Sequence, residues 1–312
     1  MKIVALAGGV GGAKLVDGLA GVLPPEDLSV IVNTGDDFEH FGLTICPDLD
    51  TVCYTLAGLA NPETGWGRVG ESWNALKSAE LLGGPAWFWL GDRDLGTHLE
   101  RTRRLKAGDR LSAITAAFCR AWGIDARILP MSDQPVRTMV DTEEGELPFQ
   151  EYFVARACEP RVRSFKFEGV EAAQPAPGVL DAIKESDLII VCPSNPWVSI
   201  DPILAVPGMR AALEGICVLA VSPIIGGKAV KGPAAKMFAE LGIEPSAFSV
   251  AQHYGKLLQG FLLDNVDSAQ TSKLEELGIM SLATDTLMQD RAGRARLAAE
   301  ILEFGGRILA KK

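Results

Sequence analysis

The stretch "AGGVGGAK", residues 7–14, decides the fold of this 312-residue chain. It follows a short apolar run with β-branched residues, which is typical of a buried strand. It precedes a segment in which apolar residues recur at helical spacing, at Leu15, Leu19, Val22 and Leu23, until "LPPED" ends it at residues 23–27. Strand, glycine-rich turn and helix in this order place backbone amides and the positive end of a helix where a ligand phosphate can bind.

The glycine-rich turn matches neither of the two familiar nucleotide motifs. A phosphate-binding P-loop ends in Gly-Lys followed by Ser or Thr, but here Ala13 precedes Lys14 and Leu15 follows it. The dinucleotide fingerprint GxGxxG also fails, because its third glycine would fall at Lys14 when counted from Gly9. The general chemistry of a phosphate site remains, with Lys14 as a nearby positive charge, and the alternative is a tight turn without a ligand.

Three more runs resemble the first strand, at residues 28–34, 187–193 and 217–223, and each precedes a plausible helix. Their near-continuous apolar character predicts an α/β fold with a mostly parallel sheet that is covered on both faces. Residues 51–175 differ, because they contain several helical patterns and one hairpin pattern. We therefore predict a core of residues 1–50 and 176–312, with 51–175 as a mainly helical insertion over the ligand-bearing end of the sheet.

Composition limits the class of protein. The chain is 47% hydrophobic and 22% charged, and no apolar run approaches the roughly 20 residues of a membrane-spanning helix. The first apolar run is too short for a signal peptide. A net charge of −10 argues against nucleic acid as the main ligand. The six cysteines form no CxxC pair, which predicts reduced and mostly buried thiols in a cytoplasmic protein.

The most polar stretch is "VIVNTGDDFEHFGLTICPDLDTV", residues 30–52, which follows the second predicted strand. It carries an amide and four carboxylates, at Asn33, Asp36, Asp37, Asp48 and Asp50, and should face the glycine-rich turn. Carboxylates beside a phosphate site can hold Mg²⁺ or accept a proton from an attacking hydroxyl. The alternative for Asp48 or Asp50 alone is a cap at the start of the next helix.

These two stretches, together with further motifs, resemble the 2-phospho-L-lactate transferase (CofD/FbiA) family of coenzyme F-420 biosynthesis. The resemblance extends from residue 1 to about residue 290 and includes the following segments: "LGDRDLGTH" at 90–98, "ILPMSDQPVRTMV" at 128–140, "CPSNPWVSIDPIL" at 192–204, "VSPIIGGKAVKGPAAK" at 221–236 and "DTLM" at 285–288. It implies a Rossmann-like three-layer sandwich with a helical insertion, and a homodimer.

The resemblance also implies an activity. Members transfer a phospho-carboxylic acid unit from a guanosine diphosphate-linked donor to the ribityl hydroxyl of Fo, an 8-hydroxy-5-deazaflavin, and release GMP with Mg²⁺ as cofactor. The acid is phospholactate, phosphoenolpyruvate or phosphoglycerate, and no residue in this sequence identifies which. The alternatives are a non-catalytic nucleotide-sugar-binding regulatory protein of the same fold and an NAD-dependent oxidoreductase, which the failed fingerprint disfavours.

The resemblance also implies a role for each group of candidate residues. Fo contacts are Asp50 and Arg93, and the catalytic carboxylates are Asp37, Asp48 and Asp50, of which Asp37 and Asp48 are the expected metal ligands. The expected ligands of the donor phosphates and nucleotide are Gly9, Gly11, Gly12, Lys14, Ser194 and Asn195.

Several other polar and aromatic residues have open roles. His98 is an acid–base candidate or a structural histidine, and one of Lys228, Lys231 and Lys236 is expected to reach the phosphates. The tryptophans of residues 66–89 either stack on the deazaflavin or are buried. Ser132 and Asp133 belong to a family-like motif but receive no role.

Overall fold

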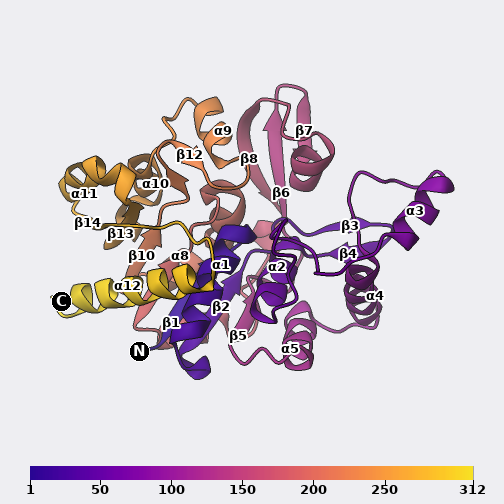
Figure 1. Ribbon diagram of the computed structural model, residues 1–312, viewed down its shortest axis with the longest axis horizontal. Helices are drawn as coiled ribbons and strands as arrows, with labels where there is room; N and C mark the ends of the chain where they lie inside the picture. The colour runs from indigo at the N-terminus through magenta and orange to yellow at the C-terminus, as the bar shows by residue number, and fades with distance from the viewer. Residues whose placement is uncertain (312) are drawn as a thin grey trace.

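The computed structural model describes residues 1–311 and has a seven-stranded sheet at its centre (Figure 1). Every neighbouring pair of strands in this sheet is parallel. The strand order is β14 (Met280–Thr284), β13 (Gly260–Asp264), β10 (Cys217–Val221), β9 (Leu188–Val191), β1 (Ile3–Ala7), β2 (Leu28–Val32) and β5 (Arg127–Pro130). The inner strands are apolar on both faces because both faces are covered, which confirms the predicted α/β class.

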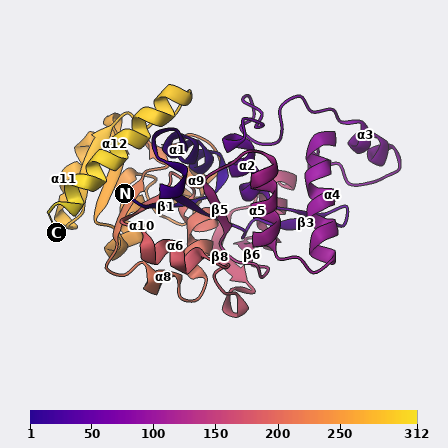
Figure 2. The ribbon, with the colours of Figure 1, turned by 90° about the horizontal axis from the view of Figure 1, so that it is seen from below.

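Helices cover both faces of the sheet, and two separate hydrophobic clusters fill the space between the layers (Figures 1 and 2). One face is covered by α1 (Gly9–Val22), α2 (Pro47–Leu56), α5 (Leu111–Ala121) and α12 (Arg291–Leu309). The other face is covered by α6 (Val179–Glu185), α7 (Asp201–Ala205), α8 (Met209–Ala212), α9 (Ala234–Glu240), α10 (Ala247–Tyr254) and α11 (Thr271–Glu276). This is the Rossmann-like three-layer arrangement.

The stretch predicted as an insertion contains more than helices. It supplies α3 (Asn74–Leu81) and α4 (Asp92–Lys106), which extend from the end of the sheet together with the hairpin of β3 (Phe38–His40) and β4 (Leu43–Ile45) (Figure 1). It also contains an antiparallel sheet of β7 (Gly145–Pro148), β6 (Arg137–Thr142) and β8 (Val162–Glu168). The predicted hairpin lies there, between β6 and β7.

The predicted boundaries at residues 51 and 175 do not enclose one structural unit. Strand β5 lies inside that range, yet it pairs with β2 as an edge strand of the central sheet. Its sequence, "RILP", is short and ends in proline, so its pattern resembles a loop more than a strand. Strands β13 and β14 also lack the β-branched runs that identify the inner strands.

Two carboxylates join the amino ends of α3 and α4. Asp92, the first residue of α4, binds the start of α3, and Glu71, which precedes α3, binds the start of α4. Asp92 accepts hydrogen bonds from the backbone amides of Asn74 (3.1 Å) and Ala75 (3.0 Å) at the start of α3. Glu71 accepts them from the amides of Arg93 (2.7 Å) and Asp94 (2.9 Å) at the start of α4. These bonds satisfy amides that a helix leaves unpaired, and hydrogen bonds, the largest from Ser72, lower the pKa of Asp92 to about 2.

All of the cysteines except the half-buried Cys158 are buried, as predicted. Within residues 1–311 the structure contains no helix with the length and apolarity needed to cross a membrane.

Helices α1 and α12 cross at a glycine. A Cβ atom added at Gly18 would lie 2.3 Å from the carbonyl oxygen of Arg294 on α12. Beside this crossing, the buried Asp17 accepts a hydrogen bond of 3.0 Å from the Arg294 guanidinium. Close backbone approach and a partly buried ion pair therefore fix α12 across α1.

We expect Gly18→Ala to lower the free energy of unfolding by about 1–3 kcal/mol, because the new methyl group must push a backbone carbonyl away. Gly21→Ala, on the same helix, is the matched control, since nothing lies within 4 Å of its added Cβ. It should leave stability unchanged or raise it by up to about 1 kcal/mol through helix propensity. Urea denaturation of both variants measures this, and equal stability of the two would contradict the close crossing.

Candidate active site

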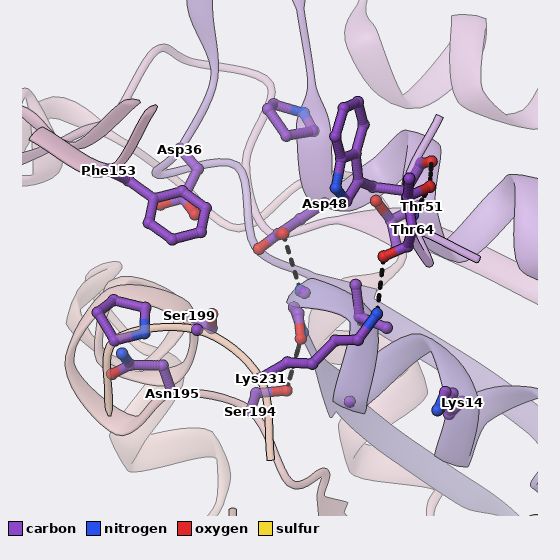
Figure 3. Close-up of a pocket in the computed structure, with 18 of the residues that line it drawn as sticks. Lys14, Asp36, Asp48, Thr51, Thr64, Phe153, Ser194, Asn195, Ser199 and Lys231 are labelled. Carbon is purple, nitrogen blue, oxygen red and sulfur yellow. Dashed lines mark hydrogen bonds between the residues drawn. The ribbon is translucent and has the colours of Figure 1, made fainter. Parts of the chain in front are cut away.

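A cavity of about 960 Å³ opens where the carboxyl ends of the central strands meet the insertion (Figure 3). The core contributes the glycine-rich turn after β1, the acidic loop after β2 and the loops after β9, β10 and β14. The insertion contributes the segments around residues 61–73 and 88–94, and residues 149–157 close a further side. Ligands of open α/β sheets bind at this end of the strands, which makes the cavity the candidate active site.

The glycine-rich turn is held from both sides by side chains of other loops. The amide of Gly8 donates to the hydroxyl of Ser194 (3.1 Å), which in turn donates to the Gly8 carbonyl (2.8 Å). The amide of Gly9 donates to Asp48 Oδ1 (2.8 Å). Side chains at the turn would clash, since an added Cβ would lie 2.4 Å from Asp48 Oδ2 at Gly8 and 2.5 Å from the Pro193 carbonyl at Gly11.

These contacts divide the predicted phosphate ligands into two groups. Gly9 and Gly11 line the cavity, whereas Gly12 packs against Ser194 and Ala7 behind it. Helix α1 begins at Gly9, so its first amides have no partner within the helix. With the Gly9 amide bound to Asp48, the next amides, of Val10 and Gly11, are the ones that a cavity ligand can meet.

Two lysines line the cavity, and each is bonded to a backbone carbonyl. Lys14 Nζ donates to the Met288 carbonyl (2.9 Å), and burial lowers its pKa. Lys231 Nζ donates to the Thr64 carbonyl (2.7 Å) and so connects the loop after β10 to the insertion (Figure 3). Of the three lysines in residues 221–236, Lys231 is the one in the cavity wall, since Lys236 pairs with Glu240 outside it.

The acidic loop places Asp36 and Asp48 in the cavity wall, and both side chains are buried. Asp48 accepts a second hydrogen bond from Asn33 Nδ2 (2.9 Å), in addition to that of Gly9. Asp36 Oδ1, in contrast, is buried without any hydrogen-bond partner among residues 1–311. Burial raises the pKa of Asp48 to about 6, and burial followed by the charge of Asp48 raises that of Asp36 well above its usual range.

Asp37 does not line the cavity, although it is buried beside Asp36. Burial raises its pKa to about 7, and its Oδ1 also has no hydrogen-bond partner among the described residues. Asp36 lies in a turn in which the Asp37 amide donates to the Thr34 carbonyl (3.3 Å), and this turn places the side chain of Asp36, not that of Asp37, in the cavity wall. The sequence pattern did not reveal which of the two acids faces the cavity.

Asp50 and Arg93, the predicted Fo contacts, also lie outside the cavity wall. The buried guanidinium of Arg101 forms a two-pronged ion pair with Asp50, and His98 Nδ1 lies 3.7 Å from the same carboxylate. Arg93 Nη1 donates to the Val69 carbonyl (3.1 Å) at the back of the insertion. The structure therefore places the buried Asp50 and the exposed Arg93 outside the cavity wall.

Asp50, Asp94 and His98 form a buried cluster whose possible metal-ligating atoms lie within 4.8 Å of one another. Arg101 already neutralises this cluster, because its guanidinium pairs with Asp50 and approaches His98 Nδ1 at 3.2 Å. A cation placed here would meet that positive charge at close range, so the cluster does not fit a metal.

The insertion adds an aromatic surface to the cavity wall. Trp73 and Trp89 meet edge to face with ring centroids 5.4 Å apart, and Trp66 is 47% exposed and Trp89 59% exposed. The Arg68 guanidinium, also in the wall, lies 5.5 Å from the ring centroid of Tyr54. Trp87, by contrast, is half-buried and packs on Phe38 and His40 outside the wall.

The remaining predicted residues have structural contacts. Asn195 lines the cavity, but its Oδ1 accepts the amide of Trp197 (3.1 Å) and so caps the helical turn that follows. Asp133 accepts from the amide (2.7 Å) and hydroxyl (2.9 Å) of Ser112 at the start of α5, and Ser132 donates to Gln134. The motif of residues 128–140 therefore anchors a helix and does not line the cavity.

The sequence patterns did not single out several residues of the cavity wall, some of them inside the quoted motifs. They are Thr51, Thr64, Arg68, Glu71, Asp94, Phe149, Phe153 and Ser199. Asp94 was detectable, since it lies inside "LGDRDLGTH" next to the selected Arg93.

The raised pKa of Asp37 predicts a pH-dependent contribution to stability. Because its folded-state pKa of about 7 exceeds the unfolded value near 4, the folded state holds an extra proton between these values, and stability falls as pH rises through them. Without metal, we expect Asp37→Asn to be more stable relative to wild type at pH 8 than at pH 5, by about 1–3 kcal/mol. Urea denaturation at both pH values measures the difference. Asp125→Asn, at an exposed site, is the control, and an Asp37→Asn effect that does not vary with pH would contradict the assignment.

Comparison with known proteins gives one consistent family. The family model described as 2-phospho-L-lactate transferase CofD matches residues 3–301. A phosphoenolpyruvate transferase of Streptomyces griseus is 46% identical over 99% of this chain and 100% of its own length, and one of Thermobifida fusca is 47% identical over 86% and 88%. A solved structure from the UPF0052 family of Bacillus halodurans matches with a TM-score of 0.64, at 14% identity over 96% of this chain and 98% of that one, which shows the shared fold.

The family match covers nearly the whole chain and includes both strand-end loops that build the cavity. This chain belongs to the 2-phospho-L-lactate transferase (CofD) family.

Proposed function

We propose that this chain transfers a phospho-carboxylic acid unit from a guanosine diphosphate-linked donor to the ribityl hydroxyl of Fo, releasing GMP, in coenzyme F-420 biosynthesis. One observation carries the proposal. A single cavity joins the amino end of α1 and two buried carboxylates, Asp36 and Asp48, to an aromatic wall with Trp73 and Trp89. The helix end and the carboxylates suit a diphosphate with a metal ion, and the aromatic wall suits a flat heterocycle.

The donor diphosphate binds, in this proposal, at the amides of Val10 and Gly11 beside Lys231. Phosphoryl transfer depends mainly on positioning and on neutralising negative charge, and these groups supply donors and a cation in one place. Lys14 contributes its charge from the side, since its amine is bonded to Met288. The guanosine lies along Ser194 and Asn195, between the loops after β9 and β10.

Asp36 and Asp48 fit a Mg²⁺ ion. Asp36 has a buried oxygen without a partner, and a second carboxylate close enough to raise its pKa faces the same cavity. Mg²⁺ is commonly held by one or two carboxylates together with water and phosphate oxygens, and when bound it neutralises the charge of the diphosphate. We therefore assign the metal to Asp36 and Asp48, where the sequence had suggested Asp37 and Asp48.

Fo binds, in this proposal, against the aromatic wall of the insertion, with Arg68 at its polar edge. A guanidinium can stack on a heterocycle or bond to its carbonyl groups. Asp50 and Arg93 then support Fo binding indirectly, Asp50 by holding Arg101 and Arg93 by holding the segment at Val69.

We further propose phosphoenolpyruvate as the transferred acid. The support is the relatives of 45–47% identity named phosphoenolpyruvate transferase, from several Streptomyces species and Kitasatospora aureofaciens. The proposed setting is a cytoplasmic homodimer, in agreement with the mostly buried cysteines and the frequency of symmetric dimers.

When the guanosine-linked donors of phosphoenolpyruvate and of phospholactate are offered together with Fo and Mg²⁺, we expect the enolpyruvyl product to predominate. The two products differ by two hydrogen atoms, so mass spectrometry of the deazaflavin fraction distinguishes them. GMP release measured in parallel confirms turnover. Predominance of the lactyl product would reverse the donor assignment, and nucleotide binding without GMP or a new deazaflavin would favour a regulatory protein.

Asp36→Asn should separate the stability of the metal-free protein from its activity. At pH 8 in EDTA, we expect a higher melting temperature than wild type, because a buried charge next to Asp48 is removed. The stabilisation of wild type by Mg²⁺, about 1.4 kcal/mol at a tenfold excess over Kd, should be lost. Turnover should fall by about 10²–10³-fold or more. Thermal unfolding with and without MgCl₂, together with GMP release, measures these effects.

Asp37→Asn is the control for that experiment, since Asp37 is an equally buried acid outside the cavity wall. It should keep the Mg²⁺-dependent rise in melting temperature. If Asp37→Asn loses this rise and Asp36→Asn keeps it, the metal pair is Asp37 and Asp48.

A further inference from the structure

Four carboxylates line the cavity, and three of them already have a role in the structure or in the proposed function. Both oxygens of Glu71 accept backbone amides at the start of α4. Asp36 and Asp48 form the buried pair at the glycine-rich turn. The fourth carboxylate is Asp94, in the first turn of α4, on the side of the cavity that carries the aromatic residues.

One oxygen of Asp94 is fixed and the other is free. Oδ1 accepts a hydrogen bond of 2.6 Å from the Tyr54 hydroxyl, and His98 Nε2 lies 3.3 Å from the same atom. Oδ2 accepts no hydrogen bond from any of residues 1–311, and the side chain is 14% exposed. Asp94 is therefore held by one side while its second oxygen can meet a ligand in the cavity.

The residues behind Asp94 hold His98 beside it. Arg101 Nη1 lies 3.2 Å from His98 Nδ1, and a guanidinium can only donate, so Nδ1 is the acceptor. Asp50 holds Arg101 in turn. His98 Nε2 lies 3.3 Å from Asp94 Oδ1 but makes no hydrogen bond among residues 1–311. Burial opposes the ionisation of Asp94, but the neighbouring His98 outweighs it, so the pKa of Asp94 is lowered.

We propose that Asp94 is the catalytic carboxylate that orients the acceptor hydroxyl and takes its proton, and that Tyr54 and His98 are positioning residues for it. The proposal rests on the proposed function. Asp94 is the cavity carboxylate that has an oxygen free of protein hydrogen bonds and no place in the metal pair. In phosphoryl transfer, an ionised aspartate beside the attacking hydroxyl is sufficient, because the proton leaves late on a loose reaction path.

The acceptor oxygen forms a bond to the phosphorus that carries the acid, and the bond from this phosphorus to the bridging oxygen of the diphosphate breaks. The bonding electron pair leaves with that oxygen as GMP. The hydroxyl proton moves to Asp94 Oδ2 and passes to solvent when the products leave. No oxidant or additional reactant is needed.

Asp94→Asn tests the proposal with GMP release from the donor in the presence of Fo and Mg²⁺. We expect kcat to fall by about 10²–10⁴-fold, with KM for donor and acceptor within about threefold of wild type. Glu100→Gln is the matched control, because it removes one carboxylate charge from the exposed side of the same helix, and it should leave kcat unchanged. A kcat for Asp94→Asn within about threefold of wild type would overturn the proposal.

Tyr54→Phe is the second variant, since it removes only the hydroxyl that bonds Asp94 and keeps the buried ring. If Tyr54 positions the catalytic carboxylate, kcat should fall about 5–50-fold, in keeping with a lost hydrogen bond to a charged group, while both KM values stay near wild type. An unchanged kcat with lower stability alone would reject the positioning role, even if Asp94→Asn fails to fold. Wild-type protein without any GMP release would instead reject the proposed function itself.

Discussion

The bond between the Asp48 carboxylate and the amide of Gly9 is the contact on which the rest of the site depends. It joins the first turn of α1 to the first turn of α2, and Asn33 binds the same carboxylate from the end of β2. Removing Asp48 would leave the partly buried Gly9 amide without its partner and Asn33 Nδ2 with only the Val198 carbonyl, which costs more than the bonds contribute when made. The geometry of the candidate phosphate site and the position of the proposed metal ligand are thus set by one side chain.

The burial of several carboxylates at this site lowers the stability of the folded protein when they are ionised. Asp36, Asp37 and Asp48 are all buried, and burial raises the pKa of each. Buried carboxylates without a nearby cation favour the neutral form, so the empty site is poorly matched to neutral pH. In the proposed function, a divalent cation held by Asp36 and Asp48 would remove this penalty.

The insertion holds an aromatic surface over the carboxyl end of the sheet. Helices α3 and α4 extend from the body (Figure 2), and few apolar contacts fix them, because α3 buries only Leu76 and the buried residues of α4 are all polar. The exchanged caps of Glu71 and Asp92 join their amino ends, and the buried chain of Asp50, Arg101 and His98 connects α4 to α2. Asp94, in the first turn of α4, contacts both the Glu71 cap and His98, and these contacts fix its position in the cavity wall.

The sequence by itself determined the α/β class, the position of the first helix and the two loops that carry the chemistry. These features are local, because apolar runs, glycines and proline act on the neighbouring backbone. It also identified Gly9, Gly11, Lys14, Asp48, Ser194 and Asn195, which all line the cavity. Only the tertiary structure decided that Asp36 and not Asp37 faces the cavity, that Asp50 and Arg93 lie outside its wall, and that β5 completes the sheet. The direction of a loop side chain and the pairing of a weak edge strand depend on neighbours distant in the sequence, and no pattern along the chain records those neighbours.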